Sequence, residues 1–236
     1  MPKVPNIQSV IPGLLVSVWH VTEDEDFFRE KLTLFEGELN TISNYLHPER
    51  RLLWLASRYC LKEMLNLDSS KAHVESLSME SGAPFLSDNS FKISFSHSHR
   101  FAAAIASPTH KVSVDLEDAH KDRNLEVARR FMNTQEHEKW ALIGTKELYL
   151  AIFSAKECLI KMVGKKTSMR DHIHISFDNF DGKRNGTLYG TVQKADIVQH
   201  YEVHYHINPD FVLTYATHIV QPNISGEFDP APRAIH

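Results

Sequence analysis

The sequence contains little cysteine and no long apolar segment, and each absence excludes a class of protein. Its 236 residues include only two cysteines, Cys60 and Cys158, both in segments expected to be helical. This pattern does not suit a disulfide framework and favours a reducing compartment. No stretch approaches the ~20 apolar residues of a membrane span, and the N-terminal apolar run is too short for a signal peptide. We therefore expect a cytoplasmic protein without a membrane partner.

An excess of positive charge is also lacking. The chain has 26 Lys and Arg against 30 Asp and Glu, for a formal net charge of -4. Proteins that bind nucleic acid usually show a basic excess, so no nucleic-acid partner is expected. Local basic clusters can still bind phosphate groups. The hydrophobic content of 42% is sufficient for a buried core in one large domain or two small ones.

The motif of a serine hydrolase is missing from the sequence, and that of a nucleotide-binding P-loop is incomplete. Serine, histidine and aspartate residues occur near one another, but no G-x-S-x-G elbow supports a serine hydrolase. The segment Gly164-Lys165-Lys166-Thr167 resembles the end of a phosphate-binding P-loop. The first glycine of that motif is replaced by Leu159, which belongs to an apolar helical stripe, so we reject a P-loop.

Hydrophobic periodicity predicts the same order of elements twice, namely a strand, then helices, then strands. In the first half we expect a strand at 14–19, helices at 23–39 and 49–67, and strands at 73–77, 91–95 and 101–106. In the second half we expect a strand at 111–117, helices at 124–131, 134–143 and 146–163, and strands at 172–177, 187–192, 200–207 and 211–218. The order predicts an α+β fold with similar halves at 1–110 and 111–220, followed by a loose tail at 221–236.

A pair of carboxylates marks the end of the strand at 111–117. Asp115 and Glu117 are two residues apart, so on a strand they point to the same side. Paired carboxylates repel each other unless a cation or a proton lies between them. Oxygen ligands of this kind suit Mg²⁺. The alternative is a solvated strand end, which this segment alone favours.

A glutamate and a lysine lie on the polar side of the helix at 146–163. Glu157 and Lys161 are four residues apart and are therefore neighbours on the helix surface. The opposite side carries an apolar stripe that includes Leu148, Ile152 and Leu159. By itself the pair is interpreted as a surface ion pair.

Two further groups could bind phosphate. Ser96 and His97 follow a strand, where a hydroxyl and an imidazole can contact a phosphate, although a polar turn is the simpler interpretation. Arg50, Arg51 and Arg58 share one helix, and arginine pairs with phosphate through a planar, bidentate fork. The alternative is that these arginines form only the solvated face of that helix.

The order of these segments carries more information than any one of them. The chain shows Arg51 on a helix, then S-G-A-P-F-L, F-S-H-S, S-V-D-L-E, F-S-A-K-E-C-L-I-K and a G-K-K segment. This succession resembles the 4'-phosphopantetheinyl transferases of the larger, surfactin-synthetase-activating type, with specific motifs between residues 50 and 166. The chain departs from the family motifs at four positions, where it has Ala83 instead of lysine, Ser113 instead of glycine, Phe153 instead of tryptophan and Cys158 instead of alanine.

The resemblance implies a pseudo-twofold pair of α+β halves with the active site between them. The N-terminal half would supply contacts to the phosphates of coenzyme A, and the C-terminal half the metal and catalytic residues. Asp115, Glu117 and Glu157 would hold Mg²⁺. Glu157 would be the catalytic base or only a metal ligand, and Lys161 would stabilise charge in the reaction.

The resemblance also implies which residues contact coenzyme A. Arg51, Ser96 and His97 are expected at its phosphates. Lys156 and Lys161 are expected at the pyrophosphate or the adenosine end. Coenzyme A is thus the expected substrate, and Mg²⁺ the expected cofactor.

The implied activity is that of a holo-[acyl-carrier-protein] synthase, a 4'-phosphopantetheinyl transferase. Such an enzyme transfers the 4'-phosphopantetheine group of coenzyme A to a serine of an acyl or peptidyl carrier protein and releases adenosine 3',5'-bisphosphate. A monomer is expected because two halves in one chain can form the cleft. Two alternatives remain: a non-catalytic module that binds coenzyme A or a carrier protein, and a metal-dependent diphosphate hydrolase.

Overall fold

The structure is a computed structural model that describes residues 4, 7, 11–65, 76–78, 82–121 and 125–218. Helices and antiparallel sheets alternate along the chain, so the predicted α+β class is confirmed. None of the helices in these described ranges is both long and apolar enough to cross a membrane. The predicted turn residue Ser81, most of the strand at 73–77 and the tail at 221–236 lie outside the described residues.

The N-terminal half places three helices against a small sheet. The sheet has the strand order β1-β5-β4, and both of its pairings are antiparallel. The longest of the three helices begins with Pro48, whose fixed φ suits a first helical position. The elements are β1 (Leu15–His20), α1 (Glu25–Lys31), α2 (Glu36–Ser43), α3 (Pro48–Met64), β2 (Ser76–Ser78), β3 (Pro84–Leu86), β4 (Lys92–Ser98) and β5 (Phe101–Ser107).

The C-terminal half covers a larger antiparallel sheet with a long helix. The strand order is β6-β10-β9-β8-β7. Eleven residues of the long helix are buried, which explains the apolar stripe in its sequence. The elements are β6 (Val112–Asp118), the 3₁₀ helix η1 (Leu125–Arg130), α4 (Thr134–Ile143), α5 (Lys146–Val163), β7 (Ile173–Ser176), β8 (Asn185–Lys194), β9 (Ile197–Ile207) and β10 (Phe211–His218).

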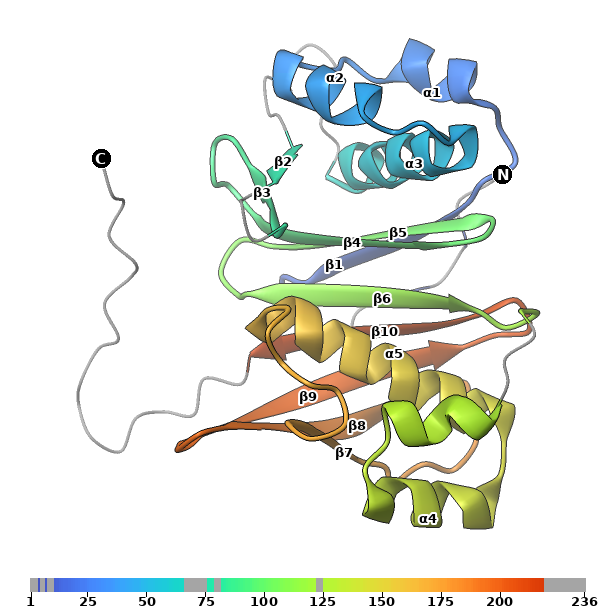
Figure 1. Ribbon diagram of the computed structural model, residues 1–236. Coiled ribbons are helices and arrows are strands. Elements are labelled where there is room, and N and C mark those ends of the chain that lie inside the picture. The colour runs from blue at the N-terminus through green and yellow to red at the C-terminus, as the bar shows by residue number, and fades with distance from the viewer. Residues whose placement is uncertain are drawn as a thin grey trace.

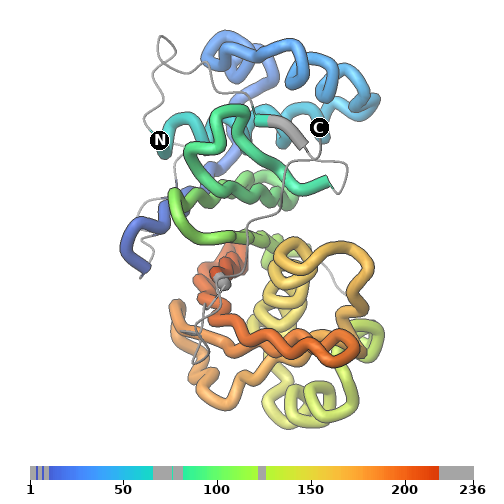
Figure 2. The backbone as a smooth tube through the Cα atoms, turned by 90° about the vertical axis from the view of Figure 1, so that its left-hand side faces the viewer, coloured from blue at the N-terminus to red at the C-terminus, as the bar shows by residue number. Residues whose placement is uncertain are grey.

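The two halves share a strand topology. In each half the first strand pairs with the last, and the last strand also pairs with the strand before it, as β1-β5-β4 and β6-β10-β9. Figure 1 shows α1, α2 and α3 on one side of the two sheets, with α5 and α4 on the other. Figure 2, from the side, shows the halves stacked along the long direction of the molecule. The pseudo-twofold relation between them stays a prediction.

The helix predicted at 23–39 is divided into α1 and α2. The first helix ends at Lys31, and the capping residue Leu32 that follows has an extended backbone (φ -104°, ψ 124°). The second helix begins at Glu36, and the N–H of the capping residue Phe35 donates to the carboxylate of Glu38. The carbonyl of Thr33 between them accepts a hydrogen bond of 2.8 Å from Lys62 on α3. Tertiary contacts therefore interrupt a segment whose periodicity favours one helix.

The other predicted elements agree more closely with the structure. The limits of α4, α5 and β10 are as predicted. The segment expected to be a helix at 124–131 is the 3₁₀ helix η1, and the short strand β3 was not predicted. A three-residue strand contains too few residues to show a period of two.

The halves are joined through the edges of their sheets. Alternate serines of β4 accept hydrogen bonds from alternate backbone N–H groups of β6, and each bond joins residues 20 positions apart. The two strands therefore run in the same direction, with serine hydroxyls replacing the carbonyls of a regular ladder. The bonds are Val114 to Ser94 (3.3 Å), Leu116 to Ser96 (3.2 Å) and Asp118 to Ser98 (3.1 Å).

An apolar cluster supports this junction. It includes Val16 of β1 and Ile105 of β5 from one sheet, with Val114 of β6 and Leu213 of β10 from the other. The two sheets thus share a buried core, and the halves do not behave as separate domains joined by a linker. This shared core holds the facing edges of β4 and β6 in register.

We expect Ser94→Ala to destabilise the protein, because the buried N–H of Val114 then loses its acceptor. The expected loss is about 1–3 kcal/mol in the free energy of unfolding, measured by urea denaturation. Ser90→Ala is the matched control, since the hydroxyl of the exposed Ser90 donates to its neighbour Asp88. Equal stability of the two variants would contradict a structural role for the serine bonds.

Candidate active site

Asp115 lies at the junction of the two halves. It is on the middle of β6, and only 5% of its surface is exposed. Its Oδ1 accepts hydrogen bonds from Ser96 of β4 (3.0 Å) and Lys161 of α5 (2.9 Å). Its Oδ2 accepts one of 2.8 Å from Ser154 of α5. One carboxylate therefore binds together the edge strand of one half, the edge strand of the other, and the long helix.

The hydroxyl of Ser154 is itself oriented. Its oxygen is 2.8 Å from the hydroxyl of Thr214 on β10. Because the Ser154 proton is donated to Asp115, the Thr214 hydroxyl must be the donor in this second contact. The three groups form a buried chain of hydrogen bonds that fixes the rotamer of Asp115.

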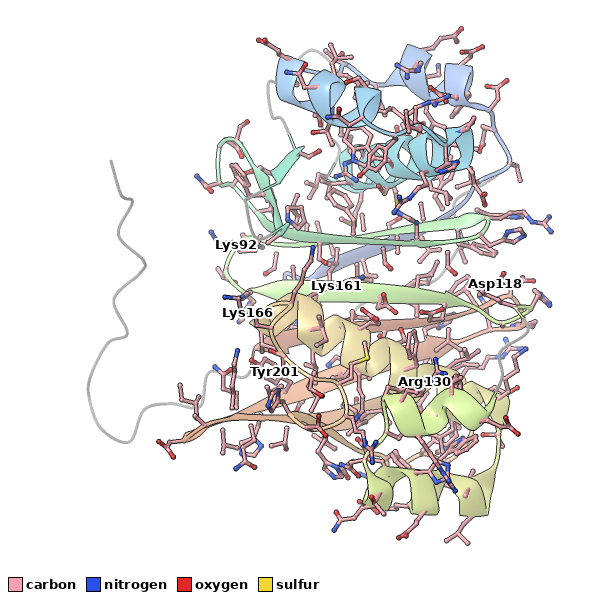
Figure 3. The ribbon with its side chains drawn as sticks, in the orientation of Figure 1. Lys92, Asp118, Arg130, Lys161, Lys166 and Tyr201 are labelled. Atoms are coloured by element: carbon pink, nitrogen blue, oxygen red, sulfur yellow. The ribbon has the colours of Figure 1, made fainter. Side chains whose placement is uncertain are left out.

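Lys161 connects the same elements as a cation. Its ammonium donates to the carbonyls of Val114 (2.8 Å) and Phe95 (3.4 Å), as well as to Asp115. The side chain extends from the end of α5 toward β6 and β4, at the opposite end of β6 from Asp118 (Figure 3). Its side chain is 32% exposed, so part of it is open to solvent or to a ligand.

Glu157 lies on the helix face that points to Asp115. It is three residues after Ser154 and four before Lys161, and both of those residues contact the Asp115 carboxylate. Glu157 is partly buried. Glu117 is two residues beyond Asp115 and points to the same side of β6, where it is 9% exposed. The structure thus places all three predicted carboxylates on the facing surfaces of α5 and β6.

These carboxylates fit Mg²⁺ in their chemistry. Within the described ranges, no three His, Cys, Asp or Glu side chains are grouped so that they alone could hold a metal ion. Mg²⁺, however, is usually held by one or two carboxylates together with substrate phosphates. The Lys161 ammonium, surrounded by three protein oxygens, shows that this junction attracts a cation.

Three cationic side chains act on His97 through their charge. The residue is exposed on β4. Desolvation of the ring and then the nearby charges of Lys161, Arg58 and Arg50 lower the pKa of His97. A neutral imidazole among three cations can donate to an anion, and the surrounding charge favours that anion. We refer to Arg50, Arg58 and Lys161, together with the neutral His97 on which their charges act, as the cationic cluster.

Two of the predicted phosphate contacts are engaged within the protein. Arg51 donates to Glu25 (3.2 Å) and to the carbonyl of Tyr45 (3.1 Å), so its guanidinium is held by the N-terminal segments. Ser96 is buried, and its hydroxyl donates to the Asp115 carboxylate and accepts from the N–H of Leu116. The structure indicates that Ser96 orients Asp115, and a direct contact of Arg51 or Ser96 with coenzyme A stays a prediction.

Lys156 requires a correction, because its side chain is fully buried. Its ammonium donates to Glu136 of α4 (2.6 Å) and to the carbonyls of Met169 (2.9 Å) and Ile173 (2.7 Å). Burial lowers the pKa of Lys156, and the charge of Glu136 opposes that effect. With three acceptors and no exposed surface, this ammonium is not placed to contact coenzyme A. It instead fixes the orientation of α5.

Sequence reasoning missed some residues of this site. For Arg58 the sequence left open a phosphate contact or a solvated helix face, and its exposure of only 7% excludes the solvated face. Glu136 was not singled out, although it accepts from Lys156 and from the N–H of Ile175 (2.6 Å). The alternate serines of F-S-H-S were a visible signal for a polar strand edge, whereas Ser154 and Glu136 gave none.

The comparison with protein families agrees with this geometry. Residues 111–216 match the family model of the 4'-phosphopantetheinyl transferase superfamily. No curated protein matches the chain. The match covers β6, α5 and the five-stranded sheet except for the last two residues of β10, and therefore includes Asp115, Glu117, Glu157 and Lys161. It supports a transferase that acts in phosphopantetheine transfer.

We expect Lys156→Met to destabilise the protein by about 3–5 kcal/mol, because the Glu136 carboxylate is left buried without its cation. The double variant Lys156→Met with Glu136→Gln should recover much of that loss, since the amide oxygen is neutral and can still accept hydrogen bonds. Urea denaturation measures both. A double variant no more stable than the single one would contradict the assignment of a buried ion pair.

Proposed function

We propose that the chain is a 4'-phosphopantetheinyl transferase of the larger, surfactin-synthetase-activating type. It transfers the 4'-phosphopantetheine group of coenzyme A to a serine of an acyl or peptidyl carrier protein, as a holo-[acyl-carrier-protein] synthase does. The observation that carries this proposal is the junction at Asp115, where the carboxylates of the matched superfamily region lie beside the cationic cluster. Carboxylates for a divalent cation and cations for phosphates are the two requirements of a diphosphate substrate.

The proposed reaction is a displacement at phosphorus. The oxygen of the carrier serine attacks the β-phosphorus of coenzyme A and forms a new O–P bond. The bond between that phosphorus and the bridging oxygen breaks, and adenosine 3',5'-bisphosphate leaves with the bonding electrons. The serine proton passes to a base, for which Glu157 is the candidate. The protein contributes mainly positioning and charge stabilisation, as in other phosphoryl transfers.

The side chains have separate proposed roles. Asp115, Glu117 and Glu157 hold Mg²⁺, which when bound neutralises charge on the pyrophosphate. The partly exposed Lys161 side chain stabilises the negative charge that develops on the leaving oxygen. His97 donates a hydrogen bond to a phosphate of coenzyme A. Ser96 and Ser154 keep the Asp115 carboxylate in place.

The proposed partner is a carrier protein that presents acidic groups near its serine. Lys165, Lys166 and Arg170 follow α5 and supply a basic surface for such a partner. We also propose that the chain works as a cytoplasmic monomer, because both halves of the site come from one chain.

Intact-mass spectrometry of an apo carrier protein tests this function. The carrier is incubated with the chain, coenzyme A and Mg²⁺, and we expect it to gain the mass of one phosphopantetheine. EDTA should prevent the gain, and so should Asp115→Asn, which keeps the shape of the side chain but removes its charge. An unmodified mass for a panel of acyl and peptidyl carriers would refute the proposed transfer.

We expect Lys161→Met to lower kcat about 100-fold, because it removes a cation that stabilises the transition state, with a small effect on the KM for the carrier. Lys146→Met, at the other end of α5, is the matched control and should retain kcat. Steady-state kinetics with an apo carrier give both constants. A change confined to the KM for the carrier would show that Lys161 contributes to docking instead.

A further inference from the structure

A lysine of the C-terminal half lies against a turn of the N-terminal half. Lys165 is exposed in the loop that follows α5, and Gly82 is exposed in the turn that leads into β3. A Cβ atom at Gly82 would lie 3.0 Å from Nζ of Lys165 and 3.6 Å from its Cε. The Lys165 ammonium therefore approaches the Gly82 backbone across the junction between the halves.

The residue at position 82 permits this close approach. The φ angle of Gly82 is +84°, in the left-handed region that favours glycine. A Cβ at this position would also push the flexible end of Lys165 away from the turn. Glycine therefore suits the backbone of the turn and at the same time keeps the ammonium beside it.

The charge of Lys165 is open to a ligand. Within the ranges that the structure describes, Lys165 has no ion pair and no hydrogen bond. Lys161, one helical turn earlier, differs because Asp115 and two carbonyls accept from its ammonium. Lys161 and Lys166, on either side of Lys165 in the sequence, both lie at the same end of α5 (Figure 3). A further exposed cation at this end of the site favours an anionic ligand there.

A cation at this turn has a counterpart in the family motifs. Those motifs have lysine at the position of Ala83, directly after Gly82. Ala83 carries no charge, but the ammonium of Lys165 lies beside the residue that precedes it. The turn leads into β3, which contacts β4, the strand that carries His97. This turn therefore has a positive charge beside it, although the charge comes from the other half of the chain.

We propose that Lys165 binds a phosphate group of the ligand held between the halves, and that it takes the place of the lysine that the family motifs have at position 83. An ammonium on a flexible stem serves phosphate as a compact point charge with three donors. The identity of the ligand as coenzyme A rests on the proposed function. Lys165 also belongs to the basic surface proposed for the carrier, and the phosphate contact is an additional role.

Isothermal titration calorimetry of the intact chain with coenzyme A and Mg²⁺ tests this contact. We expect Lys165→Met to raise the Kd about tenfold, as for the loss of one charge-assisted hydrogen bond. Lys194→Met removes a charge from an exposed residue of β8 and is the matched control, which should bind like the wild type. A parallel titration with inorganic pyrophosphate locates the contact. Its Kd rises too if Lys165 meets the diphosphate, and is unchanged if Lys165 meets the 3'-phosphate.

A second variant tests the position of the charge. Ala83→Lys restores lysine to the turn, so the double variant Lys165→Met with Ala83→Lys should recover most of the affinity for coenzyme A. A lysine that served only the carrier would not be replaced by one at position 83. A double variant with the Tm of the wild type but without recovered affinity would contradict the inference. If the double variant unfolds, the single variant decides.

An unchanged Kd for coenzyme A in Lys165→Met would overturn the inference. So would an effect confined to the KM for the carrier, because Lys165 would then serve docking alone. A wild type that binds neither coenzyme A nor pyrophosphate would contradict both the inference and the proposed function. Binding does not require transfer, so a wild type that binds coenzyme A through Lys165 but modifies no carrier would refute only the proposed function.

Discussion

The contact between Lys161 and Asp115 is the interaction on which the rest of the site depends. It joins a helix of the C-terminal half to the strand at which the two sheets meet, and the same ammonium reaches the carbonyl of Phe95 in the N-terminal half. Ser96 and Ser154 complete the coordination of the carboxylate. Any ligand that binds between the halves must therefore meet a charge arrangement that the fold has already fixed.

Two buried cations illustrate different uses of charge in this protein. Lys156 is compensated by Glu136 and by two carbonyls, and its ammonium serves to hold α5 against α4 and β7. Arg58 is nearly as buried, and its guanidinium lies against the rings of Trp54 and Phe95, with the charge of the buried Glu38 acting on it from α2. Removing either partner of a buried charge pair leaves an uncompensated charge, so both arrangements fix the helices that carry them. The first holds α5 in place, and the second holds α3 against β4.

The sequence predicted an element correctly where a long hydrophobic period coincided with residues that favour the start or the end of a helix. The limits of α5 followed from its apolar stripe and from Gly164, and the common side of Asp115 and Glu117 followed from the period of a strand. It was insufficient where tertiary contacts decided the outcome. The division at Leu32 depends on Lys62 and Glu38, and the burial of Lys156 depends on a glutamate twenty residues earlier. Such long-range pairs have no local pattern in a single sequence.

The most direct measurement of the central claim is the stoichiometry of the released nucleotide. Adenosine 3',5'-bisphosphate is quantified by chromatography beside the modified carrier, in reactions with and without apo carrier. A transferase built around Asp115 and Lys161 should release one nucleotide for each carrier modified, and none when the carrier is omitted. Nucleotide release at the same rate without a carrier would identify a diphosphate hydrolase and contradict this account.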